Sequence, residues 1–193
     1  NLFKKNKVEI LTANCISPDW TTIWRQCNRE GFYPKFATVA KALLFPSALE
    51  ALGNNIGHGL TTEVWWSRYH PYKSSLTGES PMVLCDAWEK ETKRQWSPPI
   101  GFKHGGYEIV FDVLKRAQTL EKNALRDAIE KTNLDTIMGP IKFNEKHYCE
   151  TPLVGGQWVK GKKWPYELEL TYSGNFPEIK PTAEMIFPLP KTG

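Results

Sequence analysis

The chain has 193 residues, of which 40% are hydrophobic, and it carries a formal net charge of +4 at pH 7. Charges of both signs with this apolar content exclude an intrinsically disordered chain, and no apolar run is long enough to cross a membrane. The densest basic cluster, residues 160–163, predicts a turn between two strands and lacks the basic-aromatic motif of a nucleic-acid-binding protein. We therefore expect a globular protein with no nucleic-acid partner.

The first strand and helix follow one another directly. Residues 8–13 (VEILTA) are short, apolar and partly β-branched, which predicts a buried strand that ends where Asn14 and Cys15 begin a loop. Ser17 suits the N-cap of the next helix and Pro18 its first position. That helix has one apolar face at helical spacing, formed by Trp20, Ile23, Trp24 and Cys27.

The alternation continues to residue 66. A second strand over 36–40 leads to a helix that begins near Pro46, buries Leu49 and Leu52 and stops at Gly53, and a third strand runs through residues 60–66. This order predicts an α/β fold with a doubly wound parallel sheet. Backbone N–H groups at the strand-to-helix turns of such a sheet point into a crevice, so the turn at residues 17–19 predicts a cleft for a small anionic or polar ligand.

Beyond Tyr69 the pattern changes to loops and helices. Residues rich in Ser, Pro and Gly predict a crossing loop, followed by a helix over 82–96 with Val83 and Ala87 inward and Trp88 as a further candidate for that face. A second helix carries an apolar stripe: Tyr107, Val110, Phe111, Leu114 and Ala117. Asn123 is expected to cap a third, shorter helix with Leu125 and Ile129 inside.

The last quarter of the chain reads as strands and coil. Gly139 and Pro140 predict a turn into residues 141–143, and a second polar crossing covers residues 144–152. Residues 153–159 and 166–172 then predict a hairpin, and a proline-punctuated coil follows. The final LPKTG coincides with a sortase pattern but lacks the apolar stretch and basic tail of a sorting signal, so we interpret it as chance or as an artificial end of the chain.

The four cysteines and the search for catalytic motifs give little support for an enzyme. Cys15, Cys27, Cys85 and Cys149 lack the spacing of a zinc site, and their even count permits disulfides in an oxidising compartment without showing them. Cys15 near a helix N-terminus is the one place that favours a thiolate, with His104 or His70 as its base. No nucleophile motif, carboxylate pair or phosphate loop accompanies it, so we expect no catalysis, cofactor or metal.

Six segments in order carry a family resemblance: VEILTANCISPDW, ATVAKALLFP, EVWWSRYHPY with SSLTGES, PPIGFKHGGYE, TNLDTIMGPIKFNE and GGQWVKG. Together they resemble the branched-chain amino-acid binding proteins of ABC importers, which have the type I periplasmic binding fold. The resemblance implies a solute-binding protein that delivers a small molecule to a membrane permease by hinge closure. It also implies a periplasmic or extracytoplasmic location, as a cell-surface lipoprotein if the organism is Gram-positive.

The resemblance covers only the C-terminal half of the longer family members. It assigns residues 1–66 and 152–193 to lobe two and residues 67–151 to the later part of lobe one, whose first half is absent. The helices over 102–117 would then lack a parallel sheet to cover, so we expect the remaining polypeptide or a second copy of the chain on that face. A ligand-sensing domain of a receptor or regulator is the alternative function with the same fold.

The resemblance also implies a set of ligand-binding residues: Asn14, Cys15, Ile16, Ala40, Lys41, Trp65 and Trp66 from lobe two and the hinge, with Phe102 and His104 opposite them. Binders of leucine-like amino acids place an aromatic residue where Ile16 stands and an acidic residue, which pairs with the ligand's ammonium, where Ala40 stands. Without a carboxylate there, an ammonium would stay unpaired at a large cost. We therefore expect a solute with a carboxylate and an apolar or aromatic body, and Lys41 as its counter-ion.

Each of these residues also has an ordinary structural role available. Lys41 suits a solvated strand end, His104 suits a helix cap, and Phe102 suits simple packing. Because side chains alternate along a strand, at most one of Trp65 and Trp66 can face a cleft, and the other is expected in the core.

Overall fold

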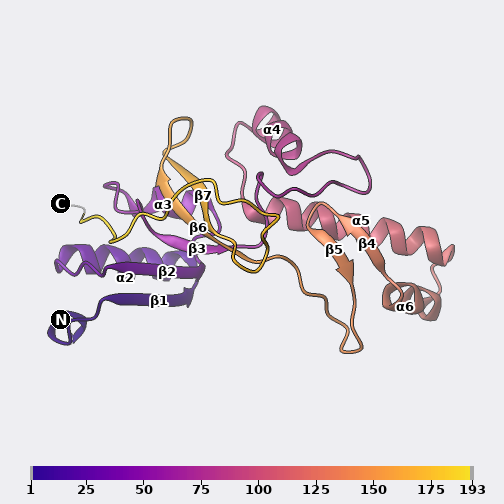
Figure 1. Cartoon of the computed structure of the whole chain (residues 1–193), viewed down its shortest axis with the longest axis horizontal. Helices are drawn as coiled ribbons and strands as arrows, with labels where there is room; N and C mark the ends of the chain where they lie inside the picture. Colours follow the sequence, from indigo (N-terminus) through magenta and orange to yellow (C-terminus); the bar gives the residue numbers. More distant parts are fainter. Residues whose placement is uncertain (1, 192–193) are drawn as a thin grey trace. The chain divides into compact units, whose positions relative to one another are not determined.

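The computed structural model describes residues 2–191, and Figure 1 shows the order of its helices and strands. The chain forms two compact units, residues 1–64 with 154–193 and residues 65–153. Thr192 and Gly193 of the C-terminal LPKTG lie outside the described residues.

The first unit is built on a five-stranded sheet with the order β1-β2-β3-β6-β7. Its first three strands are parallel, as the alternation predicted: β1 (Ile10–Cys15), β2 (Phe36–Lys41) and β3 (Thr61–Val64). The predicted hairpin forms β6 (Val154–Lys160) and β7 (Tyr166–Tyr172), and it joins β3 in antiparallel fashion. The α/β class is therefore confirmed, with a sheet that is mixed rather than wholly parallel.

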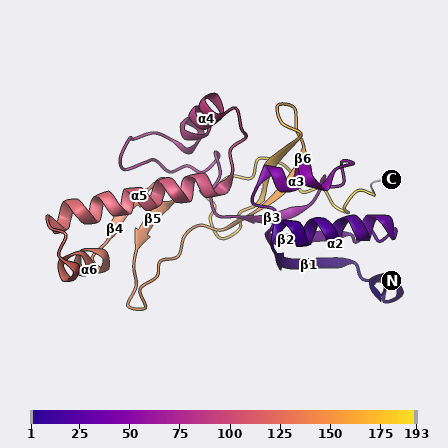
Figure 2. The same ribbon diagram turned by 180° about the vertical axis from the view of Figure 1, so that it is seen from behind.

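The helices of the first unit are α1 (Leu2–Lys5), α2 (Ser17–Arg29) and α3 (Pro46–Leu52). Because the strand order of β1, β2 and β3 follows the chain, right-handed crossovers place α2 and α3 on the same face of the sheet, where they contact each other. Gly53 ends α3 with a φ of +68°, as its position predicted. Both helices are seen from behind in Figure 2.

The apolar face of α2 is mostly buried. Trp20 and Trp24 stack with their ring centroids 5.3 Å apart, and the Trp24 Nε1–H donates to the Ile56 carbonyl at 2.6 Å. Ile23 was predicted to share this apolar face, but its side chain is 40% exposed, so the prediction is wrong for this residue. Ile23 instead lines a groove of about 390 Å³ beside Phe3 of α1, outside the face that meets the sheet.

The first strand differs from its prediction in position and burial. It begins at Ile10, and it retains Asn14 and Cys15, which pair in register with Ala40 and Lys41 instead of starting a loop. Its side chains alternate between exposed and half-buried because β1 is an edge strand with a partner on one side only. Ile10 is 63% exposed for that reason.

The second unit contains three helices and a short hairpin: α4 (Pro81–Thr92), α5 (Pro98–Ala117), α6 (Lys122–Glu130), β4 (Asn133–Thr136) and β5 (Gly139–Lys142). The strand β4 was not predicted, and it pairs with β5 in antiparallel fashion across a tight turn. It also contacts α5, which in turn contacts α6. Helix α5 therefore packs against both the hairpin and α6.

The predicted boundaries and buried faces of α4 and α6 are wrong in detail. Helix α4 ends four residues early, because Lys93 adopts a φ of +57°, and it buries Cys85 and Glu89 in place of the exposed Val83 and Ala87. Trp88 of the same helix is exposed. Neither helix is enclosed on all sides, so apolar spacing alone did not identify the inward face.

The prediction for α6 is wrong in its N-cap and in its buried face. The helix starts at Lys122 with Glu121 as the N-cap, so Asn123 lies inside its first turn and does not cap it. Ile129 is 46% exposed, and Leu125 is half-buried.

Helix α5 packs through its small residues. A Cβ placed on Gly101 would lie 2.0 Å from the Trp66 ring, and one placed on Gly105 would lie 2.5 Å from Met138. The apolar stripe from Tyr107 to Leu114 has helical spacing but is exposed along its length. Gly101 and Gly105 therefore lie on the buried face with Glu108 and Val113, and the stripe from Tyr107 to Leu114 lies on the open one.

Candidate functional site

The carboxyl ends of β1, β2 and β3 lie at one edge of the sheet in the first unit, because the three strands are parallel. The register pairs Asn14 with Ala40 and Cys15 with Lys41, so the residues predicted from two separate loops lie together. Asn14, Ile16 and Lys41 are exposed there. This edge is where open α/β sheets bind ligands.

The turn after β2 has a strained backbone. Lys41 adopts a φ of +63°, and the N–H of Ala42 donates to the carbonyl of Ala40 at 2.7 Å, which closes a tight γ-turn. A lysine rarely adopts this conformation, and such strain gathers at functional sites. Among the described residues, the Lys41 ammonium has no ion-pair partner.

Glu63 on β3 reaches the same turn. Its Oε1 accepts the backbone N–H of Lys41 at 3.0 Å, and the side chain is half-buried. A carboxylate therefore reaches this turn from the neighbouring strand, although none stands at the position of Ala40. A sequence signal did exist, since Glu63 is the one charged residue in the strand stretch 60–66.

Ser17 has a different role from the one predicted. Helix α2 starts at Ser17 with Ile16 in the N-cap position, and no side chain caps its first turn. The Ser17 hydroxyl donates instead to the carbonyl of Ala42 at 2.8 Å. It thereby links the start of α2 to the turn that follows Lys41, because a carbonyl of the adjacent loop lies within its reach.

The cysteines do not have the properties of a catalytic thiolate. Burial raises the pKa of the Cys15 thiol, and the nearby Asp19 raises that pKa further. All four cysteines are free thiols, and burial raises the pKa of each. Residues 2–191 contain no cluster of three or more His, Cys, Asp or Glu residues that could hold a metal ion.

The two tryptophans that open the second unit differ in burial, although the predicted strand over 60–66 ends at Val64 and both lie beyond it. Trp66 is fully buried, and its Nε1–H donates to the Ile137 carbonyl at 3.0 Å, so the structure places it in the core rather than on a ligand-binding surface. Trp65 is half-buried and meets Phe102 edge to face, with ring centroids 5.4 Å apart. Of the pair, Trp65 is the one available at the surface of this unit.

His104 has a protein partner inside the same unit. Its Nε2 lies 2.8 Å from the Ser74 Oγ, which also accepts the N–H groups of Leu76 and Thr77. The His104 ring and the Ser74 hydroxyl are thus joined by a hydrogen bond that ties α5 to the loop at residue 74.

Glu108, one turn further along α5, is fully buried and reinforces this attachment. One oxygen accepts the N–H and hydroxyl of Ser75, and the other accepts the N–H of Ile137 at 2.9 Å. His104 and Glu108 together hold the 74–75 loop against α5.

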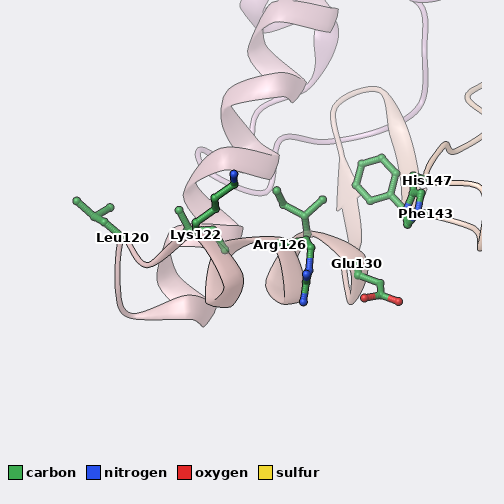
Figure 3. A pocket seen from close by; sticks show the side chains of 8 residues that line it. Leu120, Lys122, Arg126, Glu130, Phe143 and His147 are labelled. Atoms are coloured by element: carbon green, nitrogen blue, oxygen red, sulfur yellow. The ribbon is translucent and has the colours of Figure 1, made fainter.

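A pocket of about 410 Å³ lies elsewhere in the second unit. Figure 3 shows that Lys122, Arg126 and Glu130 contribute to it from α6, and that Phe143 and His147 contribute from the segment after β5. It contains none of the predicted ligand-binding residues. Arg126 pairs with its neighbour Asp127, so its guanidinium already has a partner within α6.

Comparison with known families gives a match over most of the chain. A family model described as periplasmic binding protein matches residues 2–163. No curated protein sequence matches the chain. In residues 2–191, no helix combines the length and apolar character needed to cross a bilayer.

Several solved structures share the fold. A leucine-binding protein of Thermotoga maritima has a TM-score of 0.70 at 16% identity, over 90% of this chain and 47% of that chain. A fatty-acid ABC transporter substrate-binding protein of Thermomonospora curvata has a TM-score of 0.68 at 14% identity, over 96% and 49%. An ABC transporter solute-binding protein of R. palustris, in complex with benzoate, has a TM-score of 0.64 at 13% identity, over 86% and 46%. The chain thus spans about half the length of these structures.

Proposed function

We propose, because the chain belongs to the periplasmic binding protein family, that it captures a small solute for an ABC importer. The proposed solute carries a carboxylate and an apolar or aromatic body. The proposed mechanism is hinge closure of two lobes, residues 1–66 with 152–193 and residues 67–151. The same proposal includes delivery of the solute to a membrane permease. It also includes a periplasmic or extracytoplasmic location, as a cell-surface lipoprotein if the organism is Gram-positive.

One observation carries the proposal. The ends of β1 and β2 bring Asn14, Cys15, Ile16, Ala40 and Lys41 to one sheet edge, where the Lys41 ammonium lacks an ion-pair partner among residues 2–191. An unpaired cation on a strained turn is suited to a solute carboxylate. Burial of the solute's apolar body would add about 25 cal/mol per Å² before the costs of ordering are subtracted.

The proposal includes no covalent chemistry. A thiol whose pKa is raised stays protonated at pH 7 and is a poor nucleophile, which argues against a cysteine-dependent enzyme at Cys15. Trp65, Phe102 and His104 are proposed as further contacts to the solute.

Self-association is proposed for the exposed stripe of α5, consisting of Tyr107, Val110, Phe111 and Leu114. These four side chains lie on one face of a single helix, and a contiguous apolar surface of this kind marks an interaction site. A second copy of the chain is the proposed occupant.

The experiment is calorimetric titration of the purified protein with three carboxylate probes, namely L-leucine, L-phenylalanine and benzoate. We expect saturable binding of at least one probe with a dissociation constant below about 100 μM, a typical affinity for a specific small-molecule site. Absence of saturable binding for all three would contradict the proposed solute class.

A further inference from the structure

We propose that β1 is an interaction surface at which two copies of the chain join, by antiparallel pairing of their first strands. The β1 edge is defined here as the side of Ile10–Cys15 that faces away from β2. Figures 1 and 2 both show β1 at the outside of the first unit, next to β2. This surface is separate from the carboxyl ends of the strands, so the inference goes beyond the proposed function and does not depend on the solute.

The β1 edge presents backbone groups that have no strand partner. All six residues of β1 pair with β2 in a regular parallel register. Among residues 2–191, β2 is the only strand that pairs with β1. The backbone N–H and C=O groups that point away from β2 therefore form a row to which another strand can add.

The opposite edge of the same sheet is protected by the chain itself. On β7, Leu170 accepts the N–H of Thr182 at 2.8 Å, and its own N–H donates to the Thr182 hydroxyl at 2.9 Å. The coil after β7 thus covers that edge. Glu167 and Glu169 also place two charges in β7, and charges on an edge strand oppose its pairing with another chain.

The β1 edge lacks both forms of protection. Its sequence, ILTANC, contains no charged residue and no proline. Glu9 directly precedes the strand, but its carboxylate forms an ion pair with Lys35. Ile10 is 63% exposed in the strand itself. Within one sheet, therefore, β7 is closed to a further strand and β1 is open to one.

The charge pattern favours a second copy of the chain as the partner. A two-fold axis perpendicular to the sheet makes two β1 strands antiparallel and places either Thr12 or Ala13 opposite its own copy. Because residues 10–15 are uncharged, no like charges face each other within the strands. Glu9 then lies opposite residue 15 or residue 17, and neither is charged. Each copy thereby covers the open edge of the other.

Apolar side chains beside β1 supply further area for this contact. Helix α1, which precedes β1, forms the groove of about 390 Å³ with α2, and its lining includes the exposed Leu2, Phe3 and Ile23. The two-fold axis keeps the α2 side of both copies on the same face of the joined sheet. A stable interface buries about 1,200 Å² or more, so we expect the groove to be covered together with the strand edge.

Hydrogen exchange of the unmodified protein at low and high protein concentration is the first test. We expect the amides of residues 10–15 to exchange more slowly at high concentration, because pairing gives the outward N–H groups an acceptor. Exchange in β7 should not change, since the coil already covers that strand. Association through the side chains of the α5 stripe would not protect β1, so this measurement separates the two surfaces.

Sedimentation velocity of variants is the second test. The variants carry Val110→Glu, which removes the association proposed for the α5 stripe. We expect Val110→Glu to retain a dimer, and the addition of Thr12→Lys to weaken dimerisation by about tenfold or more, because the two new charges lie close together across the axis. Thr171→Lys on β7 is the matched control, and it should leave the dimer unchanged.

Three results would overturn the proposal. The first is exchange of residues 10–15 that is independent of protein concentration, a result that requires no variant to fold. The second is a Val110→Glu protein that is monomeric at every concentration. The third is an equal effect of Thr12→Lys and Thr171→Lys on dimerisation. Failure of the carboxylate probes to bind would contradict the proposed solute class and leave the β1 edge unaffected.

Discussion

The sheet edge of the first unit and the α5 face of the second unit are both open surfaces, but they are built in opposite ways. At the sheet edge, three strands distant in sequence bring together charged and polar groups around a strained turn. On α5, a single helix exposes apolar side chains at regular spacing, while Gly101 and Gly105 are buried on its other face. The sheet edge suits recognition of a small polar solute. The α5 face suits contact with a large apolar surface of another protein molecule.

The largest expected effect concerns the buried face of α5. In Gly101→Ala the new Cβ would lie 2.0 Å from the fully buried Trp66 ring, so we expect a loss of about 3 kcal/mol in the free energy of unfolding, measured in urea. Gly106→Ala is the control, because nothing lies within 4 Å of its Cβ and helix propensity alone should add up to about 1 kcal/mol. Equal stability of the two variants would show that the glycine face is not packed as described.

At the sheet edge the expected effect is on binding. Lys41→Ala should weaken a bound carboxylate probe by about tenfold or more and leave the cooperativity of unfolding intact. Lys41→Gly should weaken it equally but stabilise the fold relative to Lys41→Ala by about 1 kcal/mol, because glycine adopts a φ of +63° without strain. Titration calorimetry and urea unfolding measure the two quantities. An unchanged dissociation constant would remove Lys41 from the site.

The apolar surface of α5 should respond to charge through association rather than folding. Val110→Glu should shift the protein toward the monomer in sedimentation velocity and change the free energy of unfolding by less than about 0.5 kcal/mol. Met82→Glu on α4 is the control, since Met82 is similarly exposed outside the stripe. A wild-type protein that stays monomeric at high concentration would contradict self-association.

The smallest expected effect is a pH dependence of the first unit. Burial, and then the charge of Lys160, lower the pKa of His58, whose Nδ1 accepts the Lys160 N–H at 3.1 Å. The unfolded chain therefore takes up this proton first as the pH falls below about 6.5, so stability decreases from there toward the folded-state pKa. The loss is small because His58 is partly exposed. It should be absent in His58→Gln, and equal acid sensitivity of both proteins would contradict the assignment.

An element could be predicted from the sequence where the spacing of neighbouring residues alone specifies it. Helix α3, with its proline start, buried Leu49 and terminal Gly53, and the hairpin of β6 and β7 were predictable, because each is specified by neighbouring residues. The inward faces of α4 and α6 were not, since they depend on which side the rest of the unit covers.

The candidate site shows the same limit. The lobe-two set from Asn14 to Lys41 came from a family resemblance, and the strand register brings its members together. Glu63 escaped sequence analysis because it acts through a hydrogen bond across 22 residues to the backbone of Lys41. Ser17 was assigned to a local cap, although its hydroxyl binds the carbonyl of Ala42, 25 residues away.

Native mass spectrometry of the purified protein tests the central claim most directly. The account predicts a retained small molecule that is released on denaturation and carries a carboxylate, and Lys41→Ala should reduce its occupancy. A protein that carries no small molecule, and that acquires none when incubated with L-leucine, L-phenylalanine or benzoate, would contradict the claim that this sheet edge captures a solute.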